Sequence, residues 1–217
     1  MPRYRTRSWR ALDVAALAAG SAVPAAAVTR TVAAARITPL ATVRILGIDP
    51  GSRRTGFGVI ECSGGGSKQL AHGCITTVGA TLGERLRQIF EGIHALVEQH
   101  RPNEVAIERV FVNRNVDSAL KLGHARGAAL CAVPQTVPVF EYAPRAIKLA
   151  VVGFGAAEKL QVAHMIRTLL QMEGRIPADA SDALAVAVCH AHSRRVHALA
   201  AGHGVASTAA APKGRAR

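Results

Sequence analysis

Residues 43–62 read VRILGIDPGSRRTGFGVIEC, and the pattern of apolar and turn residues in them predicts the fold class. A continuous apolar run begins at Val43 and ends at Asp49, and the turn-forming residues Pro50-Gly51-Ser52 follow it. The residues from Thr55 to Cys62 resume the composition of a strand. The pattern predicts a strand, a turn and a second strand.

After residue 62, the sequence pattern continues to predict strands and helices in turn. The Gly64-Gly65-Gly66-Ser67 run predicts a second turn, and residues 69–78 a third strand. From Leu82, apolar residues recur at helical spacing until Pro102 stops the helix. The remaining expected elements are a strand over 104–110, a helix over 116–133, a strand over 137–142 and helices over 156–172 and 179–192. The order βββαβαβαα predicts an α/β fold in which helices flank a mixed five-stranded sheet.

The length of 217 residues and a hydrophobic content of 49% suit one core domain with tails, which we place at 43–192. Residues 1–42 contain 13 alanines and six arginines against one acid, so we expect a disordered basic extension. It also has the composition of a transit peptide or a poor secretion signal, and it is a start-site artefact if translation begins at Val43. Residues 193–217 contain no acid and are expected to be a disordered basic tail.

Charge and cysteine content narrow the function classes only partly. The net charge of +13 divides into +5 for residues 1–42, +3 for 43–192 and +5 for 193–217, so the total is weak evidence that the core binds nucleic acid. The four cysteines match neither a zinc site nor a disulfide framework, which favours the cytoplasm. The longest uncharged run near the N-terminus, 14–29, has 16 residues, short of the ~20 that a membrane span requires.

Four acidic residues fall where the expected elements would bring them together. Asp49 ends the first strand, Glu108 follows the apolar residues 105–107, and Asp179 and Asp182 share one face near the start of the last helix. Burying these charges without cations costs several kcal/mol per ion, and all-oxygen ligands favour Mg²⁺ or Mn²⁺. As simpler alternatives, Asp49 is an ordinary turn former and Asp179 a helix cap.

Seven short motifs, in a fixed order along the chain, are similar to those of a known protein family. They are ILGIDPGS at 45–52, TGFGV at 55–59, AIERVF at 106–111, SALKLGHARG at 118–127, VVGFG at 151–155, AEK at 157–159 and ASDAL at 180–184. In this order, and across roughly residues 43–192, the chain resembles the RuvC family of Holliday junction resolvases. The resemblance implies an RNase H-like fold and a homodimer that cuts two opposed strands of a four-way DNA junction in homologous recombination and repair. His124, where the family usually has Gln, is a departure.

The resemblance also implies the chemistry. Asp49, Glu108, Asp179 and Asp182 match the family's catalytic metal ligands, which agrees with the acidic cluster expected above. Two Mg²⁺ ions about 4 Å apart, with Mn²⁺ as a substitute, would flank the scissile phosphate. The products would carry 5′-phosphate and 3′-hydroxyl ends. The RuvA-RuvB branch-migration complex is the implied partner.

Several further residues are expected to contact DNA. Phe111 matches a family position that unstacks bases at the junction centre, and Arg114 and Asn115 share its polar, basic loop. Lys148 and Lys159 match positions that face DNA phosphates. A Phe111 side chain returning to the core is the alternative for that residue.

Two other function classes compete with the nuclease. A non-catalytic junction-binding protein would keep the fold, but the presence of all four acids argues against it. Actin-like kinases and ATPases also begin with a Gly-x-Asp-x-Gly hairpin, yet this chain has no second phosphate loop and about half the length that their two lobes require.

Overall fold

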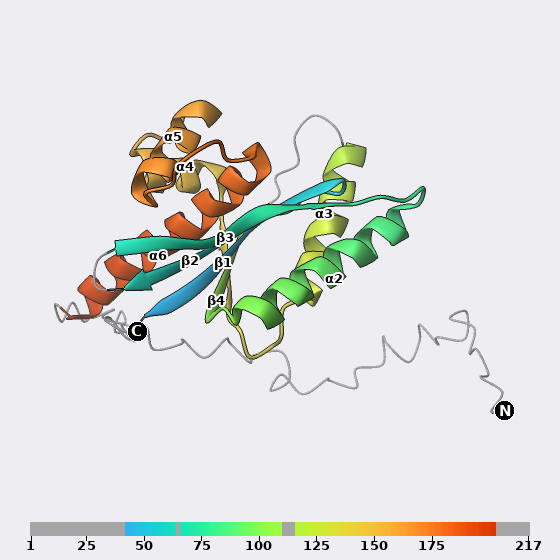
Figure 1. Cartoon of the computed structure of the whole chain (residues 1–217), viewed down its shortest axis with the longest axis horizontal. Helices are drawn as coiled ribbons and strands as arrows, with labels where there is room; N and C mark the ends of the chain where they lie inside the picture. Colours follow the sequence, from blue (N-terminus) through green and yellow to red (C-terminus); the bar gives the residue numbers. More distant parts are fainter. Residues whose placement is uncertain (1–41, 64–65, 110–115, 203–217) are drawn as a thin grey trace, which may run out of the picture. The chain divides into compact units, whose positions relative to one another are not determined.

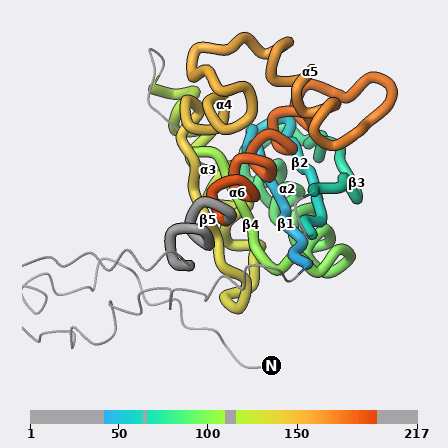
Figure 2. The backbone as a smooth tube through the Cα atoms, turned by 90° about the vertical axis from the view of Figure 1, so that its left-hand side faces the viewer, coloured from blue at the N-terminus to red at the C-terminus, as the bar shows by residue number. Residues whose placement is uncertain are grey.

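A computed structural model describes residues 42–63, 66–109 and 116–202, with side chains described up to residue 194 (Figures 1 and 2). Phe111, Arg114 and Asn115 lie outside the described residues, as do the extension up to residue 41 and the tail from 203. The strands are β1 Val43–Asp49, β2 Arg54–Ser63, β3 Gly66–Thr76, β4 Glu104–Glu108 and β5 Val139–Tyr142. The helices are α2 Leu82–His100, α3 Val116–Cys131, α4 Pro144–Val152, α5 Lys159–Leu169 and α6 Ala178–Gly202.

The five strands form one mixed sheet in the order β3-β2-β1-β4-β5. The first three strands form an antiparallel meander, whereas β4 runs parallel to both β1 and β5. In the parallel pair Ile48 is opposite Ile107, so β1 and β4 reach the same edge of the sheet together. The predicted mixed five-stranded sheet is confirmed.

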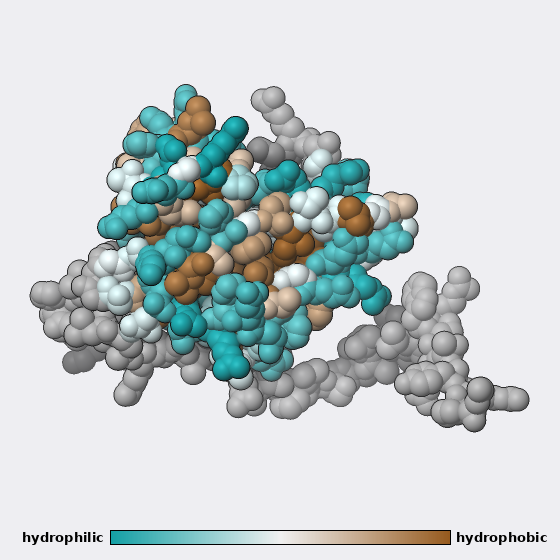
Figure 3. All heavy atoms as spheres, viewed as in Figure 1, coloured by the Kyte–Doolittle hydropathy of each residue, from teal (hydrophilic) through white to brown (hydrophobic). Residues whose placement is uncertain are grey.

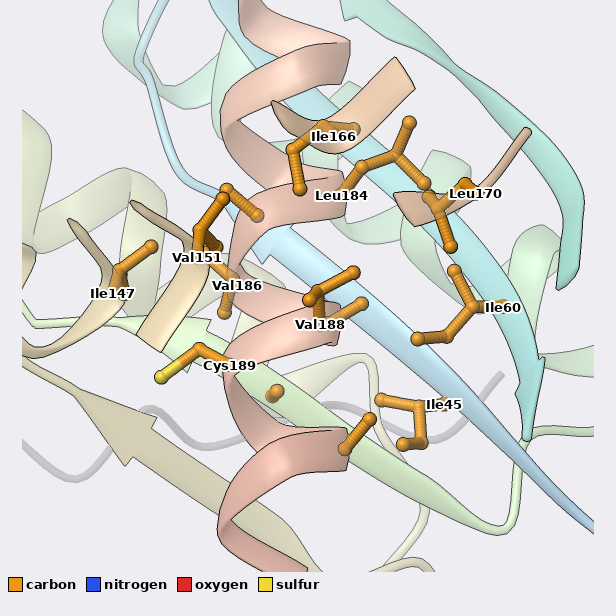
Figure 4. Packing of buried hydrophobic residues seen from close by; sticks show 14 of the residues in the cluster. Ile45, Ile60, Ile147, Val151, Ile166, Leu170, Leu184, Val186, Val188 and Cys189 are labelled. Atoms are coloured by element: carbon orange, nitrogen blue, oxygen red, sulfur yellow. The ribbon is translucent and has the colours of Figure 1, made fainter. Parts of the chain in front are cut away.

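Alternation along the strands builds one core on each face of the sheet. Leu46, Ile48 and Val105 pack on the face covered by α2 and α3. Ile45 and Ile60 pack on the opposite face, where α4, α5 and α6 lie (Figure 1). Figure 4 shows these two isoleucines turned toward Val188 of α6. Because successive strand residues face opposite ways, Asp49 follows Ile45 and Gly47 onto the α6 face.

Helix α6 lies unusually close to the sheet because glycines face it. A Cβ atom at Gly47 would overlap the carbonyl oxygen of Ala183, and one at Gly56 would overlap the carbonyl oxygen of Asp179. The approach is possible only where the strand has no side chain. The glycines of β1 and β2 therefore fix where the first turns of α6 lie.

Several strand and helix bounds differ by a few residues from the sequence-based expectations, and the largest differences are in the last three helices. Helix α4 was not predicted, although Pro144 begins it, Ile147 and Val151 share its buried face and Gly153 ends it in a left-handed conformation. Helix α5 is shorter than the expected 156–172. Helix α6 runs beyond His192 to Gly202, and Arg194, just past the expected end, pairs with buried Glu104 of the sheet.

No helix among residues 42–63, 66–109 and 116–202 is long and apolar enough to cross a membrane.

Candidate active site

Asp49 and Glu108 are brought together by the sheet. They end β1 and β4, two adjacent parallel strands, and both side chains point to the α6 face. Asp182 approaches them from the second turn of α6. A cavity of about 240 Å³ is lined by all three acids together with Pro144, Ile147, Lys148, Lys159, Val162 and Ala185.

The turn after Asp49 is held by hydroxyl groups. Thr55 Oγ1 donates to the carbonyl oxygen of Gly51 at 2.9 Å. Thr77 Oγ1 lies 3.1 Å from the carbonyl oxygen of Ser52 and 3.2 Å from that of Arg53. These bonds restrain the backbone between Asp49 and β2, and they therefore help to hold the Asp49 carboxylate in position at the end of β1.

The three acids crowd negative charge into a buried space. Burial, together with the nearby charges of Glu108 and Asp182, raises the pKa of Asp49 to about 8. Burial also raises the pKa of Glu108, while a hydrogen bond from Asp49 opposes that rise. Crowding in this buried space therefore disfavours the state in which Asp49 and Glu108 are both ionised.

Two lysines offset part of this charge. Lys159 Nζ donates to Asp182 Oδ2 at 2.9 Å, and this contact raises the pKa of the lysine. Lys159 begins α5, and Lys148 enters the cavity wall from α4, the helix that sequence analysis missed. Both lysines thus lie beside the acids, where a phosphate group attracted to one would meet the other.

Asp179 does not line this cavity. Its Oδ2 accepts a hydrogen bond from Arg54 Nε at 2.6 Å, and Cys74 Sγ lies 3.7 Å from the same oxygen. The structure therefore gathers three of the four expected carboxylates and directs the fourth to an arginine on β2. Sequence analysis missed Arg54 because its partner is 125 residues away and no local pattern marks the pair.

The donor set suits a hard divalent cation. Within the described part of the chain, no three acidic, histidine or cysteine side chains form a preassembled cation site. Carboxylate oxygens are nevertheless the ligands that Mg²⁺ and Mn²⁺ prefer, and the raised pKa values of Asp49 and Glu108 reflect crowded negative charge that a cation would neutralise.

Comparison with known proteins adds to this geometry. A profile described as "Crossover junction endodeoxyribonuclease RuvC" matches residues 45–190. A protein of that name from Methylococcus capsulatus is 56% identical over 153 residues, which cover 70% of this chain and 92% of the relative. One from Shewanella sp. is 52% identical over 165 residues, which cover 76% of this chain and 95% of the relative.

Solved structures agree with the sequence relatives. T. thermophilus RuvC in complex with a Holliday junction substrate matches with a TM-score of 0.67 and 34% identity, covering 71% of this chain and 96% of that chain. The yeast mitochondrial Holliday junction resolvase Ydc2 matches with a TM-score of 0.53 and 11% identity, and the match covers 73% of this chain and 84% of that chain. At that identity the second match shows a shared fold alone.

Proposed function

Because the chain belongs to the RuvC family of crossover junction endodeoxyribonucleases, we propose that it resolves four-way DNA junctions by metal-dependent nicks on two opposed strands. Recombination and DNA repair are the processes in which such junctions arise. The observation that carries the proposal is the cavity in which Asp49, Glu108 and Asp182 meet beside two lysines.

In this proposal the acids hold Mg²⁺, with two ions per site and Mn²⁺ as a substitute. Asp49, Glu108 and Asp182 are the ligands already gathered, and Asp179 completes the set on leaving Arg54. When bound, Mg²⁺ supplies activation of a water nucleophile and charge stabilisation at the leaving 3′ oxygen. Lys148 and Lys159 attract and orient the scissile phosphate. Hydrolysis then leaves a 5′-phosphate and a 3′-hydroxyl group.

Further DNA contacts are assigned to the segment that follows β4. Glu108 ends β4 within the acidic cavity, so Phe111, Arg114 and Asn115 follow the site closely in sequence. An aromatic ring with basic and amide neighbours suits unstacked bases at a junction centre. These three roles rest on the family resemblance.

Paired nicks require two active sites, which supports a homodimer. Helix α3 exposes Val116 and Leu120, an apolar pair one turn apart, with exposed fractions of 63% and 59%. A Cβ atom at Gly123 or Gly127 would meet no described atom within 4 Å, so another helix could approach this side of α3 closely. Cytoplasmic location and cooperation with RuvA-RuvB complete the proposal.

Cleavage of a synthetic four-way junction tests the proposal. The full chain with Mg²⁺ is expected to nick two opposed strands, and EDTA is expected to abolish cutting while binding persists. The nicked product is expected to be closed by DNA ligase, because ligase requires a 5′-phosphate beside a 3′-hydroxyl group. Junction binding without cleavage at any Mg²⁺ or Mn²⁺ concentration would identify a non-catalytic junction-binding protein instead.

A further inference from the structure

A second cavity adjoins the acidic one and has the opposite charge. It has a volume of about 370 Å³ and shares Lys159 and Asp182 with the first cavity. Its basic lining residues are Lys159, His164, Arg167 and Arg175, and Asp182 is the single acid in its lining. Because Lys159 already pairs with Asp182, the arginines and His164 face the cavity without a carboxylate partner there.

The arginines are available for a ligand. Arg167 and Arg175 are both exposed, on α5 and just before α6, and neither forms an ion pair with any residue in the described segments. On the face shown in Figure 3, hydrophilic residues predominate over α4 and α5. Two unpaired guanidinium groups beside one cavity favour an anion with several oxygen acceptors.

The start of α6 adds backbone donors to the same cavity. Pro177 and Ala178 line it, and the first intrahelical bond of α6 runs from Ser181 N to Pro177 O. The amide groups ahead of Ser181 therefore have no acceptor within the helix, and the helix dipole favours negative charge at this end.

Ser181 supplies an independent observation. Ser181 lines the cavity and is only 2% exposed, yet its Oγ has no hydrogen-bond partner among the residues that the structure describes. A buried hydroxyl without a partner is destabilising, and in helices this group commonly bonds the carbonyl one turn back. An anion in the cavity would provide the missing acceptor.

We propose that this second cavity binds a backbone phosphate of the cleaved DNA strand, within about two nucleotides of the scissile phosphate. The inference rests on the proposed nuclease function, because the two cavities adjoin at Lys159 and a strand crossing the acids would continue over Arg167 and Arg175. Its role is positioning: a second fixed phosphate would set the register of the strand over Asp49, Glu108 and Asp182.

The test combines protein variants with single neutral phosphates in the DNA. Arg167→Gln and Arg175→Gln are each expected to weaken junction binding about tenfold and to reduce the slope of log affinity against log salt by about 1. Arg87→Gln, an exposed arginine on α2, is the matched control and is expected to change neither. Melting temperatures of all three variants are expected to equal that of the parent chain.

A methylphosphonate scan identifies the phosphate concerned. A methylphosphonate at one position near the cut is expected to weaken junction binding by the parent chain and by Arg87→Gln. The same substitution in the DNA is expected to cause no further loss of affinity in Arg167→Gln or Arg175→Gln. Ser181→Ala is expected to weaken binding without lowering the melting temperature, since the hydroxyl has no partner to lose.

The proposal is overturned if the parent chain cleaves junctions but no methylphosphonate position loses its effect in the arginine variants. It is overturned equally if Ser181→Ala binds with parental affinity. Failure of the parent chain to cleave would instead contradict the proposed nuclease function, so the two failures are distinguishable.

Discussion

The burial of Asp49 and Glu108 destabilises the folded domain. Both line one cavity at the ends of strands whose preceding residues, Ile48 and Ile107, are buried and apolar. The cost appears in the raised pKa values of Asp49 and Glu108. Sites that bind charged ligands commonly sacrifice stability in this way.

Asp49→Asn tests this conflict directly. Without metal, the variant is expected to be more stable than the parent chain by about 0.5–2 kcal/mol, because it removes a buried repelling carboxyl group. Mg²⁺ is expected to raise the melting temperature of the parent chain more than that of the variant. Cleavage is expected to be lost while junction binding persists. Thermal melting with EDTA or Mg²⁺ and a gel-shift assay measure these effects, and a less stable metal-free variant would refute the repulsion argument.

In the proposed mechanism, Arg54 would compete with the metal for Asp179. The pair is half-exposed, so its contribution to stability is small, about 0–1 kcal/mol. Arg54→Ala is therefore expected to lower the Mg²⁺ concentration that gives half-maximal cleavage, with little change in melting temperature. Calorimetric titration with Mn²⁺ gives a second measurement that does not depend on activity. The neighbouring exposed Arg53 supplies the control variant Arg53→Ala, and an identical metal dependence in both variants would show that Asp179 is not withheld by Arg54.

Among the strands and helices, those with a clear local pattern could be predicted from the sequence, whereas contacts between distant elements could not. The strand-turn-strand of residues 43–62 and the strand at 104–108 follow from apolar runs and turn residues. Their parallel arrangement, which the structure shows, then places Asp49 and Glu108 on one edge. The Asp179 pairing depends instead on how α6 crosses β2, which periodicity does not encode. Helix α4 did have readable signals, a proline start and a glycine end, but its nine residues were too few to display a strong period.

The close approach of α6 to the glycines of β1 and β2 can be tested by substitution. Gly56→Ala places a methyl group against the backbone of Asp179, so the first turn of α6 must move away from β2. We expect a loss of about 1–3 kcal/mol in the free energy of unfolding and a marked fall in cleavage. Gly66→Ala on β3 is the control, since a Cβ there meets nothing within 4 Å among described atoms. Equal stability of the two variants would mean that α6 does not depend on the close approach.

A buried polar cluster fastens the other end of α6 to the sheet. Glu104 on β4 lies 2.6 Å from both His190 Nε2 and Arg194 Nε, and Tyr142 OH lies 2.7 Å from His190 Nδ1. Burial opposes ionisation of Glu104, but the hydrogen bond and charge of His190 and the charge of Arg194 outweigh it and lower the pKa of this carboxyl group. The cluster ties together β4, β5 and α6, from which Glu108 and Asp182 reach the active site.

The lowered pKa of Glu104 fixes the sign of a pH effect. Its contribution to stability is present above the pKa of an unfolded glutamate, about 4.3, and is lost as the pH falls through the lower folded value. Glu104→Gln is thus expected to cost about 3–5 kcal/mol at pH 7, and this difference is expected to shrink in acid. Urea unfolding from neutral pH to below about pH 4 measures it. A difference independent of pH would indicate that Glu104 stabilises the fold by packing alone.

For the whole molecule, the distribution of charge and the symmetry of the assembly bear on how the protein binds DNA. Only +3 of the net charge of +13 belongs to residues 43–192, so the basic cavity beside the acids matters more than the total. A four-way junction presents two opposed strands related by a twofold axis, and a homodimer with one site per subunit has matching symmetry. Each subunit would contribute one such site, the acidic cavity at one edge of its sheet.

Leu120→Glu tests whether α3 joins the two subunits. A charge in the centre of an apolar contact between symmetric copies would face its own counterpart, so the variant is expected to sediment as a monomer at micromolar concentration. Because Leu120 is exposed in the single chain, the substitution is expected to change the free energy of unfolding of the monomer by no more than about 0.5 kcal/mol. A monomer retains one acidic cavity, and therefore nicks one strand at a time instead of making paired cuts. Val78→Glu, at an exposed apolar residue outside α3, is the control and is expected to remain dimeric with paired cutting. If Leu120→Glu stays dimeric and makes paired cuts, the subunit contact lies on another face.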